Sequence, residues 1–173
     1  KASSIQHLAS RKKNTTTSSN NQLCQPKIIP ATSYFHIMLI KTFGSAVYGV
    51  DAVTITVEVN VLSGNHYFIV GLPDNAVKES LQRVESAVKS NGYSMPRFKL
   101  VVNLAPADIR KTGTAFDLPI AIGTIAASEQ LGNIVPLDEY IIMGELSLDG
   151  TILPIKGTLP MAITARREGY KGI

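Results

Sequence analysis

The sequence predicts an α+β fold in which helices pack on a mixed sheet. Two neighbouring segments rich in β-branched residues come first, a helical period appears after a further short strand, and Asp149–Gly150 marks a later hairpin. The predicted order is a β-meander, a helix, a strand, a helix, a hairpin, a helix and a strand. This order differs from the regular alternation of βαβ units, and 173 residues fit one domain of ordinary size.

The opening strands are predicted at 38–47 and 52–62. The second alternates apolar with polar positions, as a half-buried strand does. Its apolar set consists of Val53, Ile55, Val57, Val59 and Val61. A turn at 63–66 leads to a further strand at 67–72, so we expect a meander of two or three antiparallel strands.

A helix is predicted at 73–92, with Asp74 as its N-cap and Gly92 at its end. Its apolar residues recur at helical spacing, at Val77, Leu81, Val84 and Val88. The opposite face carries two pairs of opposite charge four residues apart, Glu79 with Arg83 and Glu85 with Lys89. We interpret these charges as a solvated face.

The rest of the chain adds a strand, two helices, a hairpin and the opening of a last strand. In chain order they are predicted at 98–106, 116–130, 140–155, 157–170 and 171–173. The first of these two helices is apolar on most sides, which is typical of a helix buried against a sheet.

Positive charge is concentrated at the start of the chain. Residues 1–37 contain five bases and no acid, which leaves 12 bases and 13 acids, a net charge of −1, in residues 38–173. Global basicity therefore gives no argument for nucleic-acid binding. The polar, low-complexity stretch within 1–37 predicts a disordered or non-native N-terminal extension, with an organellar transit peptide as the alternative.

Few residues point to a metal, a membrane or redox chemistry. Cys24 is the single cysteine, and the histidines are scattered at His7, His36 and His66, so we expect no metal site. No run reaches the roughly 18 apolar residues of a spanning helix, and a reducing, cytoplasmic setting fits. The dinucleotide fingerprint and the phosphate loop do not occur in the sequence, so we expect no cofactor in this segment.

Four stretches together resemble one family. They are VYGVDAVTITVEV, FIVGLPDNAVKES, VVNLAPADIRKTGTAFDLPIAIG and GELSLDGTILPIKGTLPMA, and the likeness covers residues 38–173. They resemble the N-terminal, ChlI-like domain of the ComM/YifB family of magnesium-chelatase-like AAA+ ATPases. The resemblance implies a Lon-protease-like fold, akin to the second domain of a small-subunit ribosomal protein.

The resemblance also implies a wider context. In this family an AAA+ module follows the N-terminal domain, so the segment is expected to be truncated before that module. ATP and Mg²⁺ are expected in the missing module. Family members are implicated in DNA branch migration during natural transformation, and they work as hexameric rings. The implied partners are the protein's own AAA+ module and neighbouring subunits, with DNA as a further candidate and no membrane.

Lon-type proteases cut with a Ser-Lys dyad, and both of its positions are altered here. The loop RKTGTAF resembles the serine loop of the family, with Lys111 and Gly113 matching the pattern and Ala115 at the serine position. The lysine position falls on Leu159. Without an attacking oxygen or an amine base, the resemblance implies a non-catalytic segment. Thr114 and Lys156 lie near the two positions, and we expect neither to substitute.

Two pairs of cations are the candidate contacts for a phosphate backbone or a neighbouring subunit, Arg110 with Lys111 and Arg166 with Arg167. A solvated face is the alternative for the second pair. For the loop itself the alternative is structural: Gly113 permits a tight turn, and Asp117 stabilises the N-terminus of the following helix.

The sequence thus favours a non-catalytic domain of a DNA branch-migration ATPase that serves assembly or DNA contact. The alternatives are an ATP-dependent Lon-like protease and a magnesium chelatase subunit. The sequence offers no cluster of porphyrin or metal ligands, so the chelatase alternative depends on the kinship of the ATPase alone.

Overall fold

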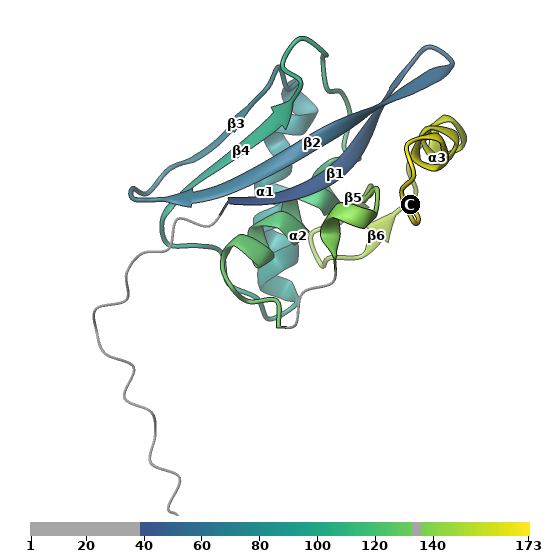
Figure 1. The fold of residues 1–173 in the computed structure, drawn as a ribbon. Helices are drawn as coiled ribbons and strands as arrows, with labels where there is room; N and C mark the ends of the chain where they lie inside the picture. The colour runs from purple at the N-terminus through teal and green to yellow at the C-terminus, as the bar shows by residue number, and fades with distance from the viewer. Residues whose placement is uncertain (1–38, 133–135) are drawn as a thin grey trace, which may run out of the picture. The chain divides into compact units, whose positions relative to one another are not determined.

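The computed structural model describes residues 39–132 and 136–173 (Figure 1). Its main sheet contains four strands in the order β1-β2-β4-β3. Their bounds are β1 (Leu39–Tyr48), β2 (Asp51–Leu62), β3 (Tyr67–Val70) and β4 (Lys99–Ala105). The sheet is mixed and helices pack on it, which confirms the predicted α+β class. The predicted extension at 1–37 lies outside the described residues.

The predicted meander is wrong at its third strand. β2 pairs with β1 on one side and with β4 on the other, both antiparallel, whereas β3 runs parallel to β4. β4 matches β2 over seven residue pairs, and β3 matches β4 over four. A parallel neighbour needs a crossover connection, and the helix between β3 and β4 supplies it.

One face of the sheet forms the core. Ile55, Val57 and Val59 of β2 are fully buried, and the polar residues that alternate with them are half-exposed. α1 (Asn75–Ser90) and α2 (Asp117–Ala127) cover this face (Figure 1). Each fully buried aliphatic side chain contributes about 1.5–3 kcal/mol, so this alternation fixes the face that the strand presents.

The predicted cap of α1 is confirmed, and so is one of its two charge pairs. Asp74 Oδ1 accepts the Val77 N–H at 2.8 Å. Lys89 Nζ lies 2.6 Å from Glu85. Arg83 instead turns toward Asp117 of α2 at 2.7 Å, where it makes two hydrogen bonds to a carboxylate that would otherwise be buried without a counter-charge.

The hairpin after α2 is much shorter than predicted. β5 (Glu145–Leu146) and β6 (Ile152–Leu153) are two residues each, although the predicted turn is present. η1 (Leu137–Glu139), a short 3₁₀ turn, precedes them. Tyr140 and Ile141 were predicted to belong to the hairpin, but they lie outside it. Tyr140 forms a parallel bridge to Gly172, and Ile141 forms one to Phe43. The predicted strand at 171–173 is therefore present as a single bridge.

α3 (Thr158–Arg167) packs against the β1–β2 hairpin (Figure 1). The Thr164 hydroxyl donates to the Ala52 carbonyl at 3.2 Å, and Glu168 accepts the Thr54 hydroxyl at 2.6 Å. The three helices begin and end within one to three residues of their predicted bounds, as fraying ends allow. No helix in the described ranges is long and apolar enough to cross a membrane.

Candidate functional site

The loop between β4 and α2 is fixed to the start of α1. The Lys111 N–H donates to the Leu72 carbonyl at 3.2 Å, and the Asp74 N–H donates to the Lys111 carbonyl at 3.0 Å. The second carboxylate oxygen of Asp74 accepts the Gly113 N–H at 3.1 Å. Gly113 has a φ of 84°, so it supplies the tight turn expected of it. One aspartate therefore caps α1 and holds this loop.

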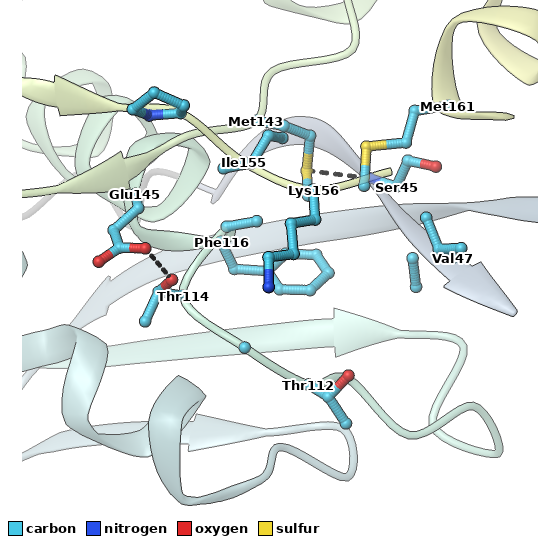
Figure 2. A pocket seen from close by; sticks show the side chains of 14 residues that line it. Ser45, Val47, Thr112, Thr114, Phe116, Met143, Glu145, Ile155, Lys156 and Met161 are labelled. Carbon is cyan, nitrogen blue, oxygen red and sulfur yellow. Dashed lines mark hydrogen bonds between the residues drawn. The ribbon is translucent and has the colours of Figure 1, made fainter. Parts of the chain in front are cut away.

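A cleft of about 330 Å³ opens beside this loop (Figure 2). It lies where three segments meet: 45–47 of β1, 112–116 of the loop, and 154–156 after β6. Met143, Glu145 and Met161 complete its lining. The cleft combines hydroxyl, carboxylate and ammonium groups with apolar side chains, which makes it the candidate binding site.

One of the two dyad positions lines the cleft and the other does not. Ala115 lines the cleft, and its carbonyl accepts the Gly144 N–H at 2.9 Å. Leu159 is 73% exposed on α3 and is not part of the cleft lining. The amine that does reach the cleft belongs to Lys156 (Figure 2). Lys156 lies before the first residue of α3, so the helical spacing of α3 could not predict that its side chain points into the cleft.

The hydroxyl and the amine in the cleft are not hydrogen-bonded to each other in the described residues. The Thr114 hydroxyl donates a short hydrogen bond to Glu145 Oε2 (Figure 2). Among the described residues, no hydrogen bond joins Thr114 to Lys156. A nucleophile needs a base within hydrogen-bond reach, and the partner of the Thr114 hydroxyl in this structure is the Glu145 carboxylate.

Asp117 lies behind the cleft and joins the elements around it. Its fully buried carboxylate accepts Arg83 Nε at 2.7 Å and Nη2 at 3.0 Å, together with the Leu146 N–H at 3.2 Å. Burial raises the pKa of Asp117, while Arg83 and the Leu146 N–H oppose that shift. Asp117 begins α2, where a negative charge also suits the helix N-terminus. It thus joins α1, α2 and β5 and places Glu145 beside Thr114.

The structure separates the four candidate cations. Arg110 is exposed and borders an open pocket at the start of α1, and Arg166 and Arg167 are exposed in the last turn of α3. Lys111 is fully buried, and its Nζ donates to the Pro106 carbonyl. Lys111 therefore does not present its charge on the surface, unlike its neighbour Arg110. Burial lowers the pKa of Lys111.

Lys111→Met is expected to leave the free energy of unfolding within about 1 kcal/mol of wild type at pH 7, because it conserves volume and removes a buried charge. A lysine whose pKa is lowered on folding binds fewer protons in the folded state. The wild type should therefore gain stability as the pH rises from its folded pKa toward 10.5, and the variant should not. Urea unfolding at pH 7 and pH 10 measures both, and equal pH profiles would contradict this interpretation.

Comparison with known proteins gives the family. The family described as subunit ChlI of Mg-chelatase matches residues 57–173. YifB of Escherichia coli (strain K12) is 46% identical over 127 residues, which is 73% of this chain and 25% of YifB. Competence protein ComM of Haemophilus influenzae is 40% identical over 127 residues, again 73% of this chain and 25% of the relative.

A protein of Mycobacterium bovis is 36% identical over 134 residues, 77% of this chain and 26% of that protein. The chain belongs to the ComM/YifB family of magnesium-chelatase-like proteins, and residues 57–173 match its ChlI domain. The matched part spans about a quarter of the length of these curated relatives.

Proposed function

We propose that this segment is a non-catalytic N-terminal domain of an AAA+ ATPase that migrates DNA branches in the manner of the competence ComM type, and that it serves assembly or DNA contact. The main support for a non-catalytic role is the set of residues at the cleft and at the dyad positions. Alanine and leucine stand at the dyad positions, and the nearby Thr114 hydroxyl is bonded to Glu145 rather than to an amine.

The wider role comes from kinship with a competence protein. The ATPase module would follow this domain, bind ATP and Mg²⁺, and assemble as a hexameric ring in the cytoplasm. Residues 38–173 have a net charge of −1, so contact with DNA would depend on local cations rather than on a global field. A ring multiplies each exposed arginine by its subunit number, which strengthens a weak local contact.

Fluorescence anisotropy of the full-length protein on branched DNA tests the contact. Replacing Arg110, Arg166 and Arg167 by Ala is expected to weaken binding. The slope of log affinity against log salt should become shallower by about 0.9 for each phosphate contact removed. Lys111→Met is the matched control, since its charge is buried and its loss should leave affinity and slope unchanged.

Two results would redirect the proposal. If the triple arginine variant keeps wild-type affinity and salt slope, this domain does not touch DNA through these residues, and assembly is its remaining role. If the variant loses hexamers in sedimentation, the arginines act at subunit contacts.

A peptidase is the second candidate, because Thr114 and Lys156 line one cleft. We expect no turnover of quenched fluorescent peptides by the full-length protein with ATP. Turnover that disappears in Thr114→Ala would revive this candidate. A chelatase function has the family description as its support. Among the described residues no group of three His, Cys, Asp or Glu side chains could hold a metal.

A further inference from the structure

The cleft is bordered by a strand edge that is only partly covered. β1 is the edge strand of the sheet. The chain at 141–142 runs alongside it only at Phe43, whose carbonyl accepts the Ile142 N–H at 2.6 Å. One step further on, the Ser45 N–H reaches the Met143 sulfur at 3.1 Å. Beyond Met143 the covering segment turns away into β5.

The backbone of Val47 therefore faces the cleft. Alternate residues of an antiparallel edge strand direct their N–H and C=O groups outward. Phe43 and Ser45 both bond away from β2, so Val47, two residues on, presents its groups on the same outer edge. Within the described residues no backbone bond reaches the outer groups of Val47. An edge of this kind is a template for one more strand.

The side chains around this edge indicate what such a strand would carry. Lys156 projects into the cleft, and it makes no ion pair among the described residues (Figure 2). Glu145, the acid of the cleft, is bonded to Thr114. Met143, Ile155 and Met161 supply apolar surface beside them. The open strand edge, the Lys156 amine and the apolar surface are the three features that a ligand must satisfy. An extended backbone with an acidic side chain and an apolar neighbour satisfies all three.

We propose that this cleft binds an extended, acidic peptide segment of a partner protein, which pairs with the β1 edge at Ser45 and Val47 and places a carboxylate against Lys156. Main-chain bonds to the edge supply affinity, and the pocket supplies the preference for an acid. The peptide is held and not cut, because Thr114 is bonded to Glu145 and no hydrogen bond joins it to Lys156 in the described residues. This proposal does not depend on DNA binding.

The test uses the full 173-residue chain, labelled with ¹⁵N, and three defined probes. The first is an N-acetylated, C-amidated hexapeptide of alternating valine and glutamate, and the second replaces glutamate by lysine. The third is the glutamate peptide N-methylated at every second amide. It is prepared in two versions, one methylated at the odd-numbered amides and one at the even-numbered amides. At about 50 mM salt, where charge contacts are weakly screened, we expect saturable shifts at Ser45, Val47 and Lys156 with the glutamate peptide.

Three variants separate the edge from the charge. Lys156→Glu should weaken binding of the glutamate peptide at least tenfold and strengthen binding of the lysine peptide, because it reverses the charge that faces the peptide. Lys156 is exposed, so its replacement does not disturb the core. Val47→Pro removes one outward N–H, which an edge strand tolerates, and should weaken both peptides at least fivefold. Val47→Thr keeps that N–H and should bind as wild type.

N-methylation in one version should abolish binding, and in the other version it should be tolerated, because alternate amides of a bound strand face away from the edge. Three results would overturn the proposal: no saturable shift at millimolar peptide, equal affinity of the two peptides for the wild type, or Lys156→Glu binding like wild type. Cleavage of the peptide would also overturn it. Lys156→Glu decides the outcome even if Val47→Pro fails to fold.

Discussion

Arg83→Met is expected to lower the free energy of unfolding by about 3–5 kcal/mol. Asp117 is fully buried and Arg83 is only 20% exposed, and their two hydrogen bonds are 2.7 and 3.0 Å long. The substitution leaves the Asp117 carboxylate with the Leu146 N–H as its remaining donor. An uncompensated buried charge is among the few lesions that produce so large a loss.

The loss in Arg83→Met should depend on pH in a defined direction. Burial already raises the pKa of Asp117, and Arg83 is the main group that opposes the rise. Without Arg83 the pKa should rise further. An acid whose pKa is raised on folding stabilises the fold when protonated, below its unfolded value of 3.8, and that contribution is lost as the pH rises through the folded pKa. The variant should therefore recover toward wild type as the pH falls.

Urea unfolding between pH 4 and pH 8 measures this effect. Arg83→Met combined with Asp117→Asn should be more stable at pH 7 than the two single losses added together, because no charge is left buried. Lys89→Met is the matched control on the same helix, since its pair with Glu85 is exposed, and it should unfold close to wild type. Additive single losses would contradict the coupling between Arg83 and Asp117.

The features that the sequence predicted are those determined by neighbours along the chain. The alternation in β2 placed Ile55 and Val59 in the core, and Asp74 is three residues from the N–H that it caps. The hairpin turn at 149–150 is equally local. Each of these patterns has a period or a spacing of a few residues, so one sequence is enough to recognise it.

The features that it missed depend on residues far apart in the chain. β3 pairs with β4 because the helix between them returns the chain in a parallel direction, which no period records. Arg83 pairs with Asp117, 34 residues away, and not with Glu79, four residues away as predicted. Lys111 is buried and its Nζ bonds to the Pro106 carbonyl of its own loop, and Lys156 reaches the cleft from a bend that precedes α3. Charge and sequence position alone do not distinguish buried Lys111 from exposed Arg110.

Gly71→Ala should be comparably severe, with a loss of more than about 3 kcal/mol. Gly71 follows β3 with a φ of 97°, a conformation that costs an ordinary residue about 1–2 kcal/mol. A Cβ there would lie 2.1 Å from the carbonyl oxygen of Leu104 and 2.8 Å from its carbonyl carbon. Leu104 is a fully buried residue of β4, so the strand has little freedom to move away.

Gly92→Ala isolates the two contributions. Gly92 has a φ of 80°, and no heavy atom beyond its own chain neighbours lies within 4 Å of the position that its Cβ would take. It should therefore show the backbone cost alone, about 1–2 kcal/mol. The excess loss in Gly71→Ala measures the clash with β4. If the two alanine variants unfold at the same urea concentration, the close approach of Gly71 to Leu104 is not present in solution.

The effect of Gly71→Ala should also extend to the candidate site. The turn at Gly71 lets the next residue, Leu72, accept the Lys111 N–H, and Asp74 then holds the loop through its own N–H and the Gly113 N–H. A shift of this turn away from Leu104 would release those three bonds. Each of them joins Leu72 or Asp74, which follow the turn, to Lys111 or Gly113 of the loop before α2. Amide exchange at Lys111 and Gly113 should therefore accelerate in Gly71→Ala and remain slow in Gly92→Ala.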